Sequence, residues 1–214
     1  MERLADGIHR WPARHPEWHP GKWGAEVACF ALTDGRRTFL IDPLVDKDLG
    51  WEELDGVVSG DVVILITIPV HVRNAAAAAD RYGAQIWGHA ACTKRLGDAA
   101  PFRELGPGSE PAGVRAFAIG KPQRQEMPLL IEAHGAMAFG DVVVGVPGRD
   151  GPIRVWMWTD FTEDWYRGRF VPTLEPLAAA APEHLLVTHG PPVVGNGAKE
   201  LQRALTRKAW YHHG

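Results

Sequence analysis

The sequence predicts an α+β domain in which two mixed β-sheets pack together with helices on their outer sides. Three observations predict this class. β-rich runs occupy both halves of the chain, and in each half helical segments follow them, so the order β-rich then α occurs twice. In addition, 214 residues, 45% of them hydrophobic, can bury one full core. We therefore expect a single domain over residues 1–214.

The first 24 residues are expected to form an irregular strap that packs on this domain. The prolines in the stretch RWPARHPEWHPGKW argue against a helix there. The same stretch contains Trp11, Trp18 and Trp23, whose indole rings are large apolar groups that favour packing on the domain body. This Trp-rich segment also offers an interface for a homodimer.

The next elements are two strands joined by a hairpin turn. The β-rich runs at residues 26–32 and 37–43 flank the sequence TDGR, and Asp-Gly is a strong hairpin signal. The second run ends in Asp42-Pro43, which places a carboxylate at the C-terminal end of a strand.

A strand–helix–strand unit follows. The continuous apolar run at residues 62–67 is typical of a strand buried on both faces. We expect a helix over residues 75–82, with Asn74 as its N-cap and Gly83 as its stop, and then a strand over residues 85–89. This order implies a parallel strand pair with a right-handed crossover.

The second half of the chain repeats the pattern of strands followed by helices. Residues 97–113 have the composition of a loop. Helices are expected at residues 174–181 and 198–210, on either side of a buried strand at residues 185–188. Before them, apolar runs that alternate with turn signals predict strands at residues 114–119, 128–133, 136–139, 142–146 and 153–158.

Composition excludes some classes of function. The formal net charge is -3, and no basic run is interleaved with aromatic residues, which argues against nucleic-acid binding through a basic face. No apolar run approaches 18 residues, and the N-terminus lacks the apolar core of a signal peptide, so we expect a cytoplasmic protein without membrane contact. In that compartment Cys29 and Cys92 would be reduced thiols.

Polar side chains at the ends of the predicted strands are the candidate functional residues. Imidazole and carboxylate groups both suit zinc, iron and manganese, so the set could form a metal site if the fold brings its members together. No HxH, HxxxH or HxxE spacing links the candidate histidines to one another, and each candidate also has a structural explanation, such as bracing a turn. The candidates are Asp42, His71 with Arg73, His89, His134, Asp141 and His189.

Four short motifs, in order along the chain, resemble the metallo-β-lactamase superfamily. They are TFLID at residues 38–42, ILIT at 64–67 with the turn and helix that follow, FGD at 139–141 and VTHG at 187–190. The resemblance covers residues 25–205. It implies a four-layer αβ/βα sandwich.

The metal-binding signature of that superfamily is largely missing. The signature after the third strand is Thr-His-x-His-x-Asp-His, which supplies most of the ligands for one or two metal ions. Thr67 matches the first position, whereas Ile68, Val70, Val72 and Arg73 stand at the four ligand positions. Aliphatic side chains cannot coordinate a metal, so the resemblance implies a degenerate site.

Few of the family's other site residues remain. A second motif, Gly-His-Thr-Pro-Gly, aligns with residues 120–122, where Lys121 replaces the histidine. Asp141 resembles the bridging aspartate, His189 the last histidine ligand, and Asp42 the early aspartate that supports the ligands.

The main hypothesis from this pattern is that salt bridges replace the metal ion. A buried carboxylate without a counter-charge is costly, so we expect Arg73 and Lys121 to pair with Asp141 and Asp42. The protein would then need no metal cofactor and would lack metal-dependent hydrolase activity. It would bind a small anionic ligand near Arg73, Lys121 and His189.

Two alternatives stay open at this point. In the first, a one-residue shift brings His71 to Asp141 and His189, and these residues hold one zinc, iron or manganese ion in an atypical hydrolase site. In the second, His71 or His189 performs metal-free acid–base catalysis. The catalytic candidates are His71, Asp141 and His189, and nothing in the sequence selects a substrate.

Overall fold

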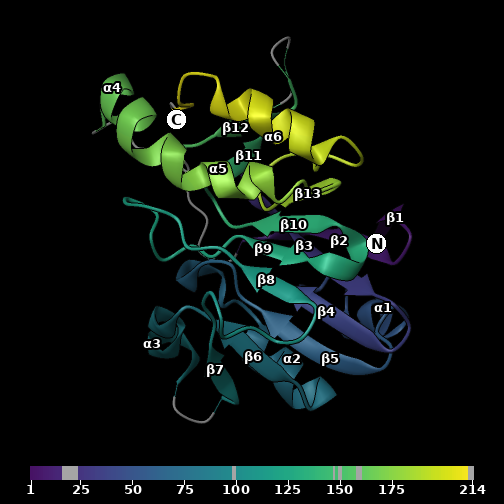
Figure 1. The fold of residues 1–214 in the computed structure, drawn as a ribbon. Helices are drawn as coiled ribbons and strands as arrows, with labels where there is room; N and C mark the ends of the chain where they lie inside the picture. Colours follow the sequence, from purple (N-terminus) through teal and green to yellow (C-terminus); the bar gives the residue numbers. More distant parts are fainter. Residues whose placement is uncertain (16–23, 98–99, 147, 149–150, 158–160, 212–214) are drawn as a thin grey trace.

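The computed structural model describes residues 1–15, 24–97, 100–146, 148, 151–157 and 161–211. Its elements form four layers, which Figure 1 shows from the purple and blue first half of the chain to the green and yellow second half. Two β-sheets face each other in the middle, and helices cover the outer side of each. This arrangement confirms the predicted α+β sandwich.

The first sheet contains seven strands, which follow one another in sequence order across the sheet. The first four strands are antiparallel, and the fourth to the seventh are parallel. The strands are β1 (Glu2–Ala5), β2 (Ile8–Arg14), β3 (Glu26–Thr33), β4 (Arg37–Ile41), β5 (Asp61–Leu65), β6 (Gln85–Gly88) and β7 (Phe102–Glu104).

The second sheet contains four strands in the order β13-β10-β9-β8, and a separate two-stranded sheet pairs β11 with β12. β10 and β13 are parallel, whereas the other pairs are antiparallel. The strands are β8 (Val114–Ala116), β9 (Leu129–Ile131), β10 (Ala136–Phe139), β11 (Val143–Gly145), β12 (Ile153–Val155) and β13 (His184–Val187).

Helices and short turns connect the strands. The α-helices are α1 (Trp51–Asp55), α2 (Ala75–Tyr82), α3 (Thr93–Leu96), α4 (Glu163–Trp165), α5 (Val171–Ala179) and α6 (Gly197–Leu205). Single 3₁₀ turns are η1 (Pro69–His71), η2 (Ala90–Cys92) and η3 (Glu132–His134), and a π-helical turn, η4 (Tyr166–Phe170), joins α4 to α5.

The period-two alternation of the strands divides the core into layers. In β3, Phe30 and Leu32 point into the core between the two sheets, whereas Cys29 and Ala31 point into the core beneath the helices. Both faces of the strand are therefore buried, which explains its continuous apolar sequence. A third core lies between the second sheet and helices α5 and α6.

The N-terminal segment differs from the predicted strap. Residues 2–5 and 8–14 form β1 and β2, and Trp11 is fully buried with its indole N–H donating to the carbonyl oxygen of Leu44 at 2.8 Å. The prolines argued correctly against a helix, but they do not prevent a strand: β1 pairs with β2 only as far as Arg10, so Pro12 needs no N–H on that side. Trp18 and Trp23 lie outside the described residues.

Two further details correct the sequence analysis. Asn74 precedes α2 but does not cap it, because its side-chain oxygen accepts a hydrogen bond from the backbone N–H of Val45 instead. The segment predicted as a loop at residues 97–113 contains β7, whose three residues carry too little pattern to be recognised. Gly83 ends α2 in the left-handed conformation, as predicted.

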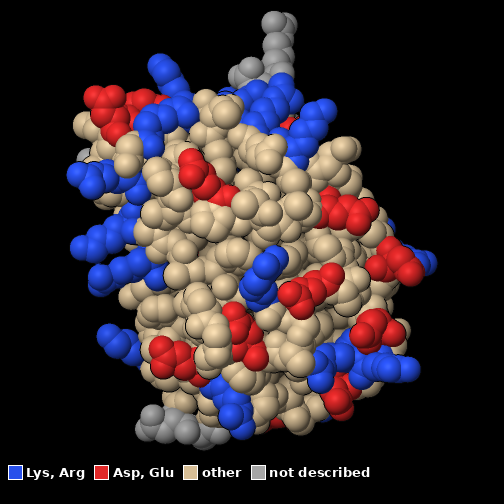
Figure 2. Space-filling model, in the orientation of Figure 1, with Lys and Arg blue, Asp and Glu red and all other residues tan. Residues whose placement is uncertain are grey.

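The surface carries both signs of charge. On the face drawn in Figure 2, acidic and basic side chains are interspersed, with basic side chains gathered toward one edge. Among the described residues, none of the helices is long and apolar enough to cross a lipid bilayer.

Candidate metal centre

The candidate site lies where two pairs of parallel strands end, β4 with β5 in the first sheet and β10 with β13 in the second. Asp42 directly follows β4, Thr67 follows β5 by two residues, and Asp141 and His189 follow β10 and β13 by two residues each. The two sheets are joined at this edge, because the N–H of Ala28 donates to the carbonyl oxygen of Thr188 at 2.8 Å. Residues that are far apart in sequence therefore meet in one place.

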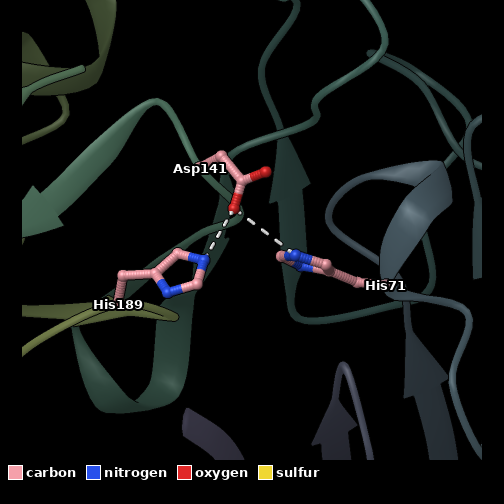
Figure 3. Close-up of side chains that lie close together, drawn as sticks. All are labelled: His71, Asp141 and His189. Carbon is pink, nitrogen blue, oxygen red and sulfur yellow. Dashed lines mark ion pairs between the residues drawn. The ribbon is translucent and has the colours of Figure 1, made fainter. Parts of the chain in front are cut away.

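His71, Asp141 and His189 converge at this edge. The Nε2 atoms of both histidines lie 3.4 Å from the same oxygen, Oδ1 of Asp141. One ligand atom from each residue lies within 4.8 Å of the other two. Figure 3 shows both rings directing a nitrogen to this oxygen. Two imidazole nitrogens and one carboxylate oxygen form a donor set that suits a single divalent metal ion.

The site is open on one side. The side chain of His71 is 4% exposed, whereas those of His189 and Asp141 are 12% and 20% exposed. Oδ1 of Asp141 itself is buried and accepts no hydrogen bond from the described residues. A buried carboxylate oxygen without a hydrogen bond is uncommon, because leaving such a group unsatisfied costs about 1–3 kcal/mol or more. A cation between the three side chains would satisfy it.

The charges at the site act on each other. Burial raises the pKa of Asp141, but the charge of His71 and the contact with His189 outweigh it and hold this pKa well below its usual range. Burial and the charge of Arg73 lower the pKa of His71, whereas Asp141 and Asp42 raise it, and the net direction is upward. The cause of both directions is that His71 lies between two carboxylates, those of Asp42 and Asp141.

Asp42 orients His71 from behind. Its Oδ2 atom lies 3.0 Å from Nδ1 of His71 and also accepts a hydrogen bond from the hydroxyl of Thr67, while its Oδ1 accepts the backbone N–H of Thr67 at 2.8 Å. With Nδ1–H donated to Asp42, the lone pair of Nε2 faces Asp141. Such a carboxylate–histidine pair is the usual support of a metal-bound imidazole.

The backbone of Asp42 is itself unusual. Its φ angle is 47°, a left-handed conformation that costs a residue with a side chain about 1–3 kcal/mol. The turn directs the carboxylate back to Thr67 and His71, and it also frees the carbonyl oxygen of Asp42 to accept the guanidinium of Arg73 at 2.9 Å.

The predicted salt bridges of Arg73 and Lys121 with Asp42 and Asp141 are not formed among the described residues. Arg73 donates to the carbonyl oxygen of Asp42 and contacts the sulfur of Cys29 at 3.4 Å, but it forms no ion pair with either predicted carboxylate. Lys121 is exposed and pairs with no described residue. The reason is that histidines already occupy the sides of Asp42 and Asp141 where the cations were expected.

The aliphatic replacements lie around the site without entering it. Ile68 packs so closely on Gly140 that a Cβ atom there would lie 2.9 Å from Cγ2 of Ile68. Val70 is exposed, and Val72 is buried in the core beneath the helices. Ile68 and Val72 therefore serve packing, whereas Val70 faces solvent.

The other two candidate histidines lie apart from this group and have structural roles. Nδ1 of His89 accepts the backbone N–H of Ala91 at 3.1 Å, which caps the turn η2. Nε2 of His134 lies 3.2 Å from the carbonyl oxygen of Thr33 and links η3 to the end of β3.

Sequence analysis missed Glu126, which is completely buried beside the site. Its carboxylate accepts backbone N–H groups from Gly140, Asp141 and Val142, each at 2.9 Å. Burial first, and then the charge of Asp141, raise the pKa of Glu126 to about 8. A charged residue just before the apolar run MPLLI was the only available signal.

Comparison with known proteins shows similarity in structure alone. No protein-family model and no curated protein sequence matches the chain. The structure is similar to a metallo-β-lactamase from Erythrobacter litoralis, with a TM-score of 0.65, 14% identity, and coverage of 96% of this chain and 93% of the other.

Two further neighbours extend this result. A metallo-β-lactamase family protein from Thermus thermophilus has a TM-score of 0.60 and 16% identity, covering 95% of this chain and 80% of that one. Rubredoxin oxygen:oxidoreductase from Desulfovibrio gigas has a TM-score of 0.65 and 14% identity, covering 96% and 60%. The protein therefore has the metallo-β-lactamase fold.

Proposed function

We propose that the protein is a hydrolase that binds one divalent metal ion through Nε2 of His71, Oδ1 of Asp141 and Nε2 of His189. The observation that carries this proposal is the buried Oδ1 of Asp141, which has two imidazole nitrogens at 3.4 Å and no hydrogen bond. Three ligands from the protein, with an open side toward solvent, are typical of catalytic rather than structural metal sites.

The donor set supports a single ion. Among the described residues, His71, Asp141 and His189 are the group of ligating side chains placed close enough together to hold a metal. In the superfamily that the sequence resembles, three further positions supply metal ligands. Here these positions carry Ile68, Val70 and Val72, and none of these side chains can coordinate a metal. We therefore expect a stoichiometry of one metal ion per chain.

The residues of the chain have distinct roles in this proposal. A bound divalent ion would supply a Lewis acid and lower the pKa of a coordinated water. Asp42 holds the ring of His71 in one orientation and one tautomer, through the 3.0 Å contact to Nδ1. Asp141 contributes the negative charge that would attract a cation between the two histidines.

The neighbours do not fix the metal or the substrate. One is named as a metallo-β-lactamase and another as an oxygen:oxidoreductase, so the same fold occurs in proteins named for different reactions. Zinc, iron and manganese all suit two imidazoles and a carboxylate. Hydrolysis is favoured here because a single ion with three protein ligands matches mononuclear zinc hydrolases such as thermolysin.

Metal content and metal titration test the proposal. Purified protein is analysed for zinc, iron and manganese, then stripped with a chelator and titrated with each ion. We expect about one equivalent to bind wild-type protein and none to bind tightly to the His71→Ala or His189→Ala variants. His89→Ala is the matched control, because His89 also follows a strand but lies outside the group. Wild-type protein that binds no equivalent of any of the three ions would contradict the proposal.

A metal-free acid–base site is the second candidate, favoured by the position of His71 between two carboxylates. Its Nδ1 contacts Asp42 and its Nε2 contacts Asp141, so the ring could pass a proton between them. An activity that survives chelation but is lost in His71→Ala would favour this candidate over a metal enzyme. The small anionic ligand predicted at the former active site would have to bind without Arg73, whose guanidinium contacts Asp42 and Cys29.

A further inference from the structure

We infer that Glu126 is a positioning residue of the metal site: its buried carboxyl group fixes the turn that carries Asp141. This inference rests on the metal site proposed above. It concerns a residue that does not touch the three ligand atoms and that acts through the backbone.

The contacts of Glu126 are directed at one turn. Oε1 accepts the N–H of Gly140, and Oε2 accepts the N–H groups of both Asp141 and Val142, each at 2.9 Å. Three consecutive backbone groups are therefore held by one side chain, and the side chain of Asp141 projects from the middle of them.

The segment that carries Glu126 also contacts the turn that carries His71. The N–H of Met127 donates to the carbonyl oxygen of Thr67 at 2.7 Å, and the N–H of Glu126 donates to the carbonyl oxygen of Gln123 at 2.8 Å. Residues 123–127, called the bracket below, thus connect the end of β5, through Met127 and Thr67, to the end of β10, through Glu126 and the backbone of residues 140–142. The bracket sets the distance between His71 and Asp141.

Gly140 allows these segments to meet. A Cβ atom at this position would lie 2.9 Å from Cγ2 of Ile68, 3.0 Å from Oγ1 of Thr67 and 3.2 Å from Cδ of Glu126. Such contacts are shorter than normal van der Waals distances. The absence of a side chain at Gly140 therefore brings the carboxylate of Glu126 within reach of the backbone of Asp141.

The chemistry of Glu126 points to a role that packing alone does not require. A completely buried carboxylate is costly, and in the described residues Glu126 has no Lys, Arg or His ion-pair partner to offset that cost. Three backbone N–H groups, all from the turn that carries Asp141, are the partners that offset this cost among the described residues.

Cobalt titration of purified full-length protein tests the inference. Co²⁺ replaces zinc in N/O sites and reports the ligand geometry through its visible spectrum. We expect Glu126→Gln to weaken Co²⁺ binding by about 10–100-fold and to change the spectrum, because supporting residues of metal ligands contribute about this much. Glu126→Asp keeps the carboxyl group on a side chain that is one methylene shorter, so we expect a smaller loss and a spectrum closer to that of the wild type.

Two control variants separate this role from general damage. Glu132→Gln removes a carboxylate from an exposed position on η3, and we expect no change in Co²⁺ affinity. Leu174→Ala opens a cavity in the core beneath α5 and lowers stability without touching the site, and we expect the spectrum of the wild type.

The outcomes distinguish this inference from the proposal on which it rests. Wild-type protein that binds no Co²⁺ overturns the metal site and this role together. If the wild type binds Co²⁺, and Glu126→Gln binds it with the same affinity and spectrum, the metal site stands and the role of Glu126 is overturned. If Glu126→Gln does not fold, the Glu126→Asp variant is the test. Co²⁺ affinity and a spectrum equal to those of the wild type in Glu126→Asp would then overturn the positioning role of Glu126.

Discussion

The Nδ1 atom of His71 lies 3.0 Å from Oδ2 of Asp42, and the two side chains are only 4% and 2% exposed. This contact determines which nitrogen of the imidazole ring is free. Because Nδ1 faces Asp42, Nε2 faces Asp141. His71 stands in the sequence between two ligand positions of the superfamily, now Val70 and Val72, and its Nε2 atom is the ligand candidate in the structure.

Replacing Asp42 by asparagine should therefore weaken metal binding while leaving all three ligands in place. An amide can accept the N–H of Thr67 but provides no negative charge behind the ring of His71. We expect a loss of metal affinity of about 10–100-fold, measured by competition with a chelating dye. Asp46→Asn, which changes a carboxylate outside the site, should bind metal with the affinity of the wild type. Equal affinity in Asp42→Asn would show that the contact does not support a ligand.

Most of the fold could be predicted because it depends on local patterns. Helix α2 was predicted over the residues that form it, since an Ala-rich run ends there at Gly83. Buried strands such as β10 and β13 appear as short apolar runs between turn signals. β2 was missed because the tolerance of Pro12 depends on where β1 ends, which is a property of the sheet and not of the segment.

The site could be predicted only in part, for a different reason. Each of His71, Asp141 and His189 was recognised as a polar residue at a strand end, but their 3.4 Å separations depend on how two sheets meet. The salt bridges predicted for Arg73 and Lys121 were wrong because charge alone does not indicate which way a side chain points. Glu126 could not be recognised from the sequence because its hydrogen-bond partners are backbone N–H groups, which do not depend on side-chain identity.

The buried Trp11 gives a test of the corrected N-terminal strand. Trp11→Ala should lower the free energy of unfolding by about 3–5 kcal/mol, because it removes a fully buried ring from the core beneath the helices. Trp11→Phe should cost less, since the ring volume is largely kept and mainly the hydrogen bond to Leu44 is lost. Urea unfolding followed by circular dichroism measures both. A cost below about 1 kcal/mol for Trp11→Ala would contradict the position of β2 in the core.

The two cysteines should be inert in the folded protein. Burial raises the pKa of the Cys29 thiol to about 11 and that of Cys92 to about 12, so almost no reactive thiolate is present at about pH 8. A thiol reagent such as Ellman's reagent should react with fewer than about 0.1 thiols in native protein and with both thiols in guanidinium chloride. Rapid reaction of native protein would show that one of the two sulfur atoms is accessible.

A glycine substitution tests the close approach at the end of β10. Gly140→Ala should lower the free energy of unfolding by about 1–3 kcal/mol, because the added methyl group meets Thr67, Ile68 and Glu126 at 2.9 to 3.2 Å. At Gly168 a Cβ atom would meet nothing within 4 Å, so Gly168→Ala is the matched control and should be neutral or stabilising. Equal effects of the two substitutions would contradict the packing described at Gly140.

Metal binding should also appear as a gain in stability. A ligand that binds only the folded state adds about 2.7 kcal/mol to the free energy of unfolding when its concentration is about 100 times its Kd. We expect this gain when a metal ion is added to chelator-treated wild-type protein, and a much smaller one for Asp141→Asn, which lacks the charge that faces both histidines. His134→Ala, outside the site, should keep the full gain. Thermal unfolding with and without metal measures the effect, and an equal gain in Asp141→Asn would place the bound ion elsewhere on the protein.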